Sequence, residues 1–184
     1  MKQSSTRSLS QTYMLYLWEQ NMEKNYDHKE IESKISLMWE KGEYFTPKID
    51  SSKKPFSIFL TPPNASGGIH IGNALMIAIQ DILARYHRAK GDPTLWIPGT
   101  DHGGYETQVT FEKVLEKTGK DRSDYRRQEL FSLVADFVKK NNETIKEQIA
   151  SLGASVDWSR FRFTMDEKSL RSVNATFEKM VADN

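Results

Sequence analysis

The order of elements within residues 56–97 constrains the fold more than any other feature of this sequence. A short apolar run, residues 56–60, predicts a buried strand, and two prolines stop it because proline cannot continue a central ladder. Apolar residues then recur at helical spacing within residues 71–90, and a second short strand is predicted over residues 94–97. Strand, glycine turn, helix and strand in this order predict a βαβ unit with a parallel sheet, so the expected fold class is α/β and Rossmann-like.

Polar residues gather where both predicted strands end, and parallel strands end at the same edge of a sheet. The first loop is rich in glycine and leads into a helix, whose start offers unpaired backbone N–H groups and a positive dipole end to an anion. We expect His70 to donate to a phosphate oxygen, Gly72 to let a flat ring approach the backbone, and Asp101 to bind an ammonium group. Phosphate beside an amine is the arrangement that activation of an amino acid with ATP requires.

The two commonest phosphate-binding patterns, G-x-G-x-x-G and G-x-x-x-x-G-K-[ST], are missing, and a histidine at a helix start is often only a cap. The spacing alone therefore leaves the role of His70 open. Four segments together, however, resemble the class I aminoacyl-tRNA synthetases, and in particular the valyl-tRNA synthetase family. The first, Pro-Pro-Asn-x-x-Gly-x-x-His-Ile-Gly-Asn, is similar to the family's His-Ile-Gly-His signature. In family order, the segments are residues 62–73, 84–92, 95–104 and 152–166.

For the nucleotide, the resemblance implies that His70 and Asn73 are catalytic and that both, with Gly72, bind ATP. His70 would contact a phosphate and Gly72 would lie beneath adenine. The implied reaction is attack of the valine carboxylate on the α-phosphorus of ATP, release of pyrophosphate, and transfer to tRNA(Val). Mg²⁺ would accompany the ATP, and no metal held by the protein itself is expected. Asn73 departs from the signature, since asparagine replaces its second histidine and cannot be cationic.

For the amino acid, the resemblance implies a pocket lined by Pro62, Pro63 and Asn64. Asp101 would hold the substrate's α-ammonium group, and His102 and Gln108 are weaker candidates nearby. Two positions differ from what the family suggests: Thr61 replaces a proline, and Tyr105 stands where a smaller aliphatic residue is expected.

The resemblance also places the chain within a longer enzyme. Residues 26–184 would form the N-terminal half of the catalytic domain, ending near the start of an inserted editing domain. Residues 1–25 would be a flexible leader. No Lys-Met-Ser-Lys-Ser second signature occurs. We therefore expect the chain to need the missing C-terminal half of the synthetase and to have little activity alone.

Three hypotheses from different classes stay open. The first is a fragment of a valyl-tRNA synthetase, with isoleucyl- or leucyl-tRNA synthetase as the near alternative because one methylene is worth only about 1–3 kcal/mol. The second is a stand-alone nucleotide-binding module that does not acylate tRNA. The third is a nucleotidyl transferase with a His-x-Gly-His loop, against which residues 99–103 and 157–159 argue.

Composition sets further limits. With 184 residues, 38% of them hydrophobic, and a net charge of +1, the chain has the composition of one soluble domain with no overall preference for nucleic acid or membrane. It contains no cysteine, which excludes disulfides and suits a reducing cytoplasm, where we expect the protein. The apolar run at residues 13–18 is too short to cross a bilayer. Further helices are predicted over residues 27–39, with a core-facing apolar side, and over 105–117. A long helix is predicted over 121–151, capped by the segment that begins at Asp121, and a last one over 167–180, capped by Thr164 or Asp166.

Overall fold

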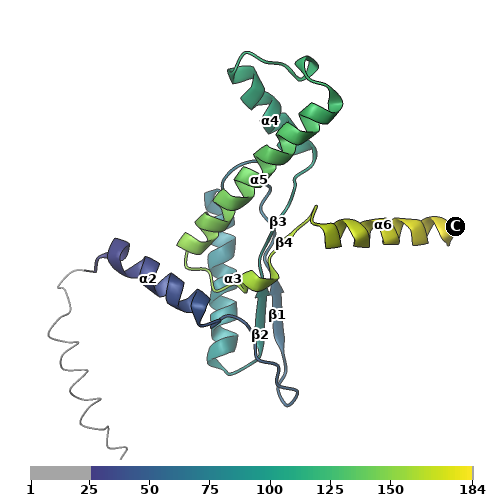
Figure 1. The fold of residues 1–184 in the computed structure, drawn as a ribbon. Helices are drawn as coiled ribbons and strands as arrows, with labels where there is room; N and C mark the ends of the chain where they lie inside the picture. Colours follow the sequence, from purple (N-terminus) through teal and green to yellow (C-terminus); the bar gives the residue numbers. More distant parts are fainter. Residues whose placement is uncertain (1–25, 184) are drawn as a thin grey trace, which may run out of the picture. The chain divides into compact units, whose positions relative to one another are not determined.

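The computed structural model describes residues 26–183 (Figure 1). It divides into two units, Met1–Leu37 and Met38–Asn184, and each is considered by itself. The predicted flexible leader, residues 1–25, lies outside the described residues. The elements are, in chain order, α2 (His28–Lys41), β1 (Phe56–Phe59), α3 (Ile71–Ala89), β2 (Thr94–Ile97), β3 (Gly99–Thr100), α4 (Tyr105–Lys117), η1 (Arg122–Asp124), α5 (Arg127–Ser151), η2 (Trp158–Arg160), β4 (Arg162–Phe163) and α6 (Glu167–Ala182).

Helix α2 begins where the sequence predicts, because Asp27 Oδ1 accepts hydrogen bonds from the backbone N–H groups of Lys29 and Glu30. Its apolar face is not buried, however. No residue of α2 is buried, and Ile31 and Met38 are 37% and 51% exposed. At the end of the helix, the ring of Trp39 packs against that of Phe45, with centroids 5.3 Å apart. Most of α2 belongs to the unit that does not contain the core, so its core-facing side stays a prediction.

The predicted βαβ unit is confirmed. Strands β1 and β2 pair in parallel, from Phe56 opposite Thr94 to Phe59 opposite Ile97, and α3 is the crossover between them (Figure 1). The pairing continues through a hydrogen bond of 2.9 Å from the N–H of Leu60 to the carbonyl of Ile97. The two prolines then interrupt it, as expected for residues that cannot support a central ladder.

A second parallel pair, β3 with β4, was not predicted. Strand β4 comes from the far end of the chain, and Gly99 of β3 lies opposite its Arg162. A Cβ atom at Gly99 would lie 2.8 Å from the carbonyl oxygen of Arg162, so the close approach of the two backbones requires glycine here. A two-residue strand is too short to show an alternating pattern, which is why the sequence did not reveal it.

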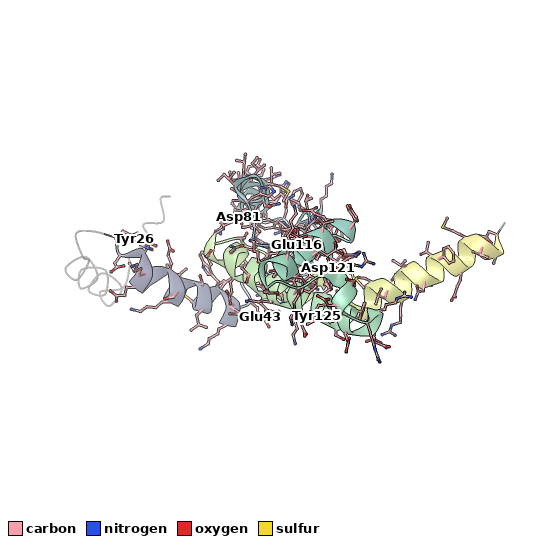
Figure 2. The ribbon with its side chains drawn as sticks, turned by 90° about the horizontal axis from the view of Figure 1, so that it is seen from above. Tyr26, Glu43, Asp81, Glu116, Asp121 and Tyr125 are labelled. Carbon is pink, nitrogen blue, oxygen red and sulfur yellow. The ribbon has the colours of Figure 1, made fainter. Side chains whose placement is uncertain are left out.

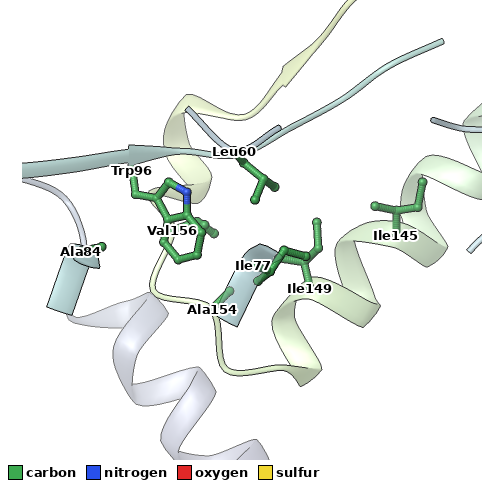
Figure 3. Close-up of a cluster of buried hydrophobic side chains, with 8 residues drawn as sticks. All are labelled: Leu60, Ile77, Ala84, Trp96, Ile145, Ile149, Ala154 and Val156. Carbon is green, nitrogen blue, oxygen red and sulfur yellow. The ribbon is translucent and has the colours of Figure 1, made fainter. Parts of the chain in front are cut away.

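The core forms where β2 and the end of β1 meet α3, α5 and the segment after α5 (Figure 3). Trp96 is fully buried, and its indole N–H donates to Gln80 Oε1 on α3 at 3.2 Å. Burying an aromatic ring of this size contributes on the order of 2–3 kcal/mol. The other buried members of this cluster are Leu60, Ile77, Ala84, Ile145, Ile149, Ala154 and Val156.

The remaining helices match their predicted extents, with one correction. Asp121 does not cap the long helix: its Oδ1 accepts from the N–H of Ser123 and caps the short turn η1, and α5 begins only at Arg127. Figure 2 labels Asp121 and Tyr125 in this connection between α4 and α5. The reason is that Tyr125 and Arg126 are extended, which separates the turn from the helix. Asp166, rather than Thr164, caps α6.

Candidate functional site

The two polar loops meet at the edge of the sheet where β1 and β2 end. The N–H of Asp101 donates to the carbonyl of Pro63 at 2.8 Å, and the N–H of Ala65 donates to the carbonyl of Asp101 at 2.7 Å. These bonds make Asn64 and Asp101 a parallel bridge beyond both strands. Two of the residues predicted to bind an amino acid, far apart in the sequence, are thus held side by side by the backbone.

The carboxylate of Asp101 is anchored through one oxygen. Oδ1 accepts hydrogen bonds from the N–H of Gly103 and from the hydroxyl of Thr164, both at 3.1 Å, and it lies 3.3 Å from Nδ1 of His102. Within residues 26–183, Oδ2 accepts no hydrogen bond, and 38% of the side chain is exposed. The second oxygen can therefore accept a hydrogen bond from a ligand.

The loop after β1 is fastened to α4 and α5. The side-chain amide of Asn64 donates to Oε2 of Glu106 in the first turn of α4 at 2.6 Å. Its neighbour Ala65 is fully buried and accepts at its carbonyl from Asn141 Nδ2 at 2.9 Å. Of the two predicted pocket prolines, Pro63 is buried and Pro62 is exposed. The loop is thus a fixed support rather than a free connection.

His70 is the N-cap of α3. Its Nδ1 accepts from the backbone N–H groups of Gly72 and Asn73, at 3.0 and 3.3 Å, and the side-chain oxygen of Asn73 accepts from the N–H of His70 at 3.1 Å. The expectation that these helix-start N–H groups are unpaired is therefore wrong for Gly72 and Asn73, because the histidine ring satisfies them. With Nδ1 used as an acceptor, a neutral ring carries its proton on Nε2, so the outer nitrogen is a donor.

The glycine-rich turn before His70 rests on α5. The N–H of Ile69 donates to Gln148 Oε1 at 2.8 Å, and a Cβ atom at Gly68 would lie 2.9 Å from the Gln148 amide. Gly72 has a different neighbour, since a Cβ atom there would meet the His70 ring at 2.9 Å. Glycine at position 72 therefore makes room for the cap itself.

Three side chains that support the site were missed by sequence reasoning: Glu106, Gln148 and Thr164. Each acts across 42 to 79 residues of sequence, and no local pattern reports such contacts. Only Thr164 carried a signal, as one of two possible caps for α6. The true cap, Asp166, has its pKa held below the ordinary value mainly by the hydrogen bond from the backbone N–H of Ser169.

Among residues 26–183, no three His, Cys, Asp or Glu side chains cluster in a way that would hold a metal ion. In the same range, no helix is both long and apolar enough to cross a membrane.

Comparison with known proteins fits this geometry. Residues 34–184 match the family model described as class I tRNA synthetases (I, L, M and V). The chain belongs to this family. As a class I synthetase it is 47% identical over 155 residues to the valine–tRNA ligase of Fervidobacterium nodosum, covering 84% of this chain and 18% of that protein. It is also 42% identical over 160 residues to the valine–tRNA ligase of Clostridium tetani, covering 87% of this chain and 18% of the relative.

The fold of this class I synthetase chain has a solved counterpart in the LeuRS of Agrobacterium radiobacter K84, determined as a ternary complex with tRNA and LeuAMS. The two share a TM-score of 0.71 at 21% identity, over 86% of this chain and 18% of the LeuRS chain. The likeness shows a shared fold, and the parallel pairing of β1 and β2 agrees with the predicted Rossmann-like class. The chain spans about a fifth of the length of the curated relatives it matches.

Proposed function

We propose that this chain supplies the amino-acid-activating part of a valine–tRNA ligase. In the reaction, the carboxylate of valine attacks the α-phosphorus of ATP, pyrophosphate leaves, and the valyl group is then transferred to tRNA(Val). The observation that carries the proposal is the bridge between Asn64 and Asp101. It brings the loop that leads to His70 beside a carboxylate whose Oδ2 has no partner among residues 26–183.

At the nucleotide end, His70, Gly72 and Asn73 bind ATP. The cap fixes the His70 ring, so its Nε2–H is oriented before the substrate arrives and can donate to a phosphate oxygen. A preorganised donor of this kind typically contributes about 2.7–4 kcal/mol to transition-state stabilisation. Mg²⁺ enters with the phosphates of ATP, as part of the substrate. The adenine would lie against Gly72, which carries no side chain.

At the amino-acid end, Asp101 Oδ2 accepts a hydrogen bond from the α-ammonium group of valine. Pro62, Pro63 and Asn64 line the pocket, and the bond from Asn64 to Glu106 fixes the asparagine. The two loops hold the ammonium group of valine at one end and the phosphates of ATP at the other. This orients the carboxylate of valine toward the α-phosphorus, and such positioning is a large part of the catalytic effect.

Valine is the substrate favoured by the identity of 42% and 47% to two valine–tRNA ligases over most of this chain. We further propose that residues 26–184 act as the first half of the catalytic domain, together with further synthetase sequence that carries the second signature, in the cytoplasm. Isoleucine and leucine are the competing substrates, and the assay must include both.

The test is a chimera in which the matched segment of the Fervidobacterium nodosum valine–tRNA ligase is replaced by the aligned residues of this chain. We expect ATP–pyrophosphate exchange that depends on valine and is much weaker with isoleucine or leucine. A chimera that folds, binds ATP and gives no exchange with valine would overturn the proposal. Exchange with isoleucine or leucine in preference to valine would reassign the substrate.

A further inference from the structure

Thr164 lies beside Asp101 because the pairing of β3 with β4 continues one step beyond both strands. Thr100 pairs with Phe163, and the N–H of Thr164 donates to the carbonyl of Thr100 at 3.2 Å. Neighbouring positions in a parallel ladder direct their side chains to the same face. A side chain 63 residues further along the chain therefore contacts the carboxylate proposed to bind the substrate amine.

The hydroxyl of Thr164 has three polar neighbours. The backbone N–H of His102 donates to Oγ1 at 2.9 Å, Oδ1 of Asp101 lies at 3.1 Å, and Nδ1 of His102 lies at 2.7 Å. The hydroxyl has one proton to donate. If that proton pointed to Nδ1, Oδ1 would face lone pairs on both Oγ1 and Nδ1. All three neighbours are satisfied when Thr164 donates to Asp101 and the His102 ring carries a proton on Nδ1.

With the protons placed in this way, the two carboxylate oxygens of Asp101 have different surroundings. Oδ1 accepts from the Thr164 hydroxyl and from the N–H of Gly103, and the protonated Nδ1 of His102 lies 3.3 Å from it. Oδ2 receives nothing from residues 26–183. A carboxylate with one oxygen tied down cannot turn freely, so the position of its other oxygen is defined before a ligand binds.

We propose that Thr164 is a positioning residue for amino-acid binding: it holds Oδ1 of Asp101 so that Oδ2 meets the substrate's ammonium group. The role rests on the proposed function of Asp101, and Thr164 itself does not touch the substrate. It also makes the segment between β4 and α6, nearly at the end of the chain, part of the amino-acid site.

The kinetic test uses the chimera described above with Thr164→Val, which keeps the shape of the side chain and removes the hydroxyl. The KM for valine in pyrophosphate exchange should rise roughly tenfold or more, as expected for loss of a hydrogen bond to a charged group, while the KM for ATP stays unchanged. Thr164→Ser should restore the KM for valine. Thr176→Val is the matched control, because the Thr176 hydroxyl donates only to the carbonyl of Ser172 in its own helix, at 2.8 Å.

A second measurement tests the hydrogen-bond network without activity. In the full chain labelled with ¹⁵N-histidine, the spectrum of the His102 ring should show a protonated Nδ1. A ring protonated only on Nε2, or a KM for valine unchanged by Thr164→Val, would overturn the role of Thr164 while leaving the proposed function standing. A protonated Nδ1 with no valine-dependent exchange in the parent chimera would instead overturn the proposed function. The role of Thr164 in positioning Asp101 for the substrate amine would fall with it.

Discussion

The carboxylate of Asp81 on α3 binds the backbone N–H and the hydroxyl of Ser155, which lies 74 residues further along the chain. Oδ1 of Asp81 accepts from the backbone N–H of Ser155 at 2.9 Å and also from its hydroxyl. Ser155 is fully buried, and its hydroxyl also accepts from Arg88. Burial lowers the pKa of the Arg88 guanidinium, and the nearby charge of Asp81 opposes this shift. The pair therefore fastens the segment after α5 to the crossover helix.

Asp81→Ala should destabilise the chain, because it leaves the buried N–H of Ser155 without a partner. We expect a loss of about 1–3 kcal/mol in the free energy of unfolding, measured in urea. The control is Arg171→Ala, which breaks an exposed i,i+4 ion pair with Glu167 on α6 and should cost less than about 0.5 kcal/mol. Equal losses in the two variants would contradict the structural role of Asp81.

Gly99→Ala should weaken the pairing of β3 with β4, because the new Cβ atom would lie 2.8 Å from the Arg162 carbonyl oxygen. The Cβ atom is fixed to the backbone of β3 and the oxygen belongs to the backbone of β4, so relief requires the strands to move apart. We expect a loss of about 1–3 kcal/mol in urea unfolding, in the range of overpacked core sites. Gly67→Ala is the matched control, since no atom lies within 4 Å of a Cβ atom there. A Gly99→Ala chain as stable as Gly67→Ala would show that the strands are not paired this closely.

His70→Asn separates the two roles of the histidine. Asparagine is a strong N-cap, so the stability of α3 should stay within about 0.5 kcal/mol of the parent chain. Its side chain does not present the outer ring nitrogen, so pyrophosphate exchange in the chimera should fall roughly 10²–10³-fold. Thermal unfolding and exchange together make the check. If the His70→Asn chimera kept the pyrophosphate exchange rate of the parent chimera, His70 would act only as a helix cap.

Acidification should weaken the start of α6 through its N-cap. The bonds from Ser169 hold the pKa of Asp166 below its ordinary value of 3.8, so the folded form favours the carboxylate. The stability contributed by this group is present above the unfolded pKa and is lost as pH falls through the lower, folded one. Amide exchange in α6 should therefore speed up below about pH 4, after correction for intrinsic rates. Asp166→Asn, which caps without titrating, should reduce this pH dependence; an unchanged profile would assign it to another group.

Local patterns predicted the elements of this fold because their signals lie within a few residues of each other. The two strands of the βαβ unit and the crossover helix end where prolines, glycines and caps stand in the sequence. The β3–β4 pair was not predictable, since its two short strands carry no periodicity and lie far apart in the chain. For α2 the predicted helix is confirmed, while its core-facing side stays a prediction.

For the site, the sequence identified the residues at the strand ends but not the groups that hold them. That His70 and Asp101 lie in loops at one sheet edge follows from where loops emerge in a parallel sheet, and their binding roles rest on the family resemblance and stay predictions. The partners Glu106, Gln148 and Thr164 depend on how α4, α5 and β4 pack, and that packing joins segments far apart in the sequence. The sequence left open whether His70 caps the helix or binds a ligand. The structure shows the cap, and a histidine that accepts at one nitrogen can still donate from the other.

The most direct test of the account is the KM for valine in pyrophosphate exchange by the chimera carrying Asp101→Asn. Asparagine keeps an acceptor for Gly103 and Thr164 but removes the charge that attracts the ammonium group. We predict that the KM for valine rises roughly 10- to 100-fold, as for loss of a charged hydrogen bond, and that the KM for ATP does not change. Unchanged valine dependence, or a loss that falls on ATP instead, would contradict the claim that Asp101 and His70 serve the two ends of one amino-acid-activating site.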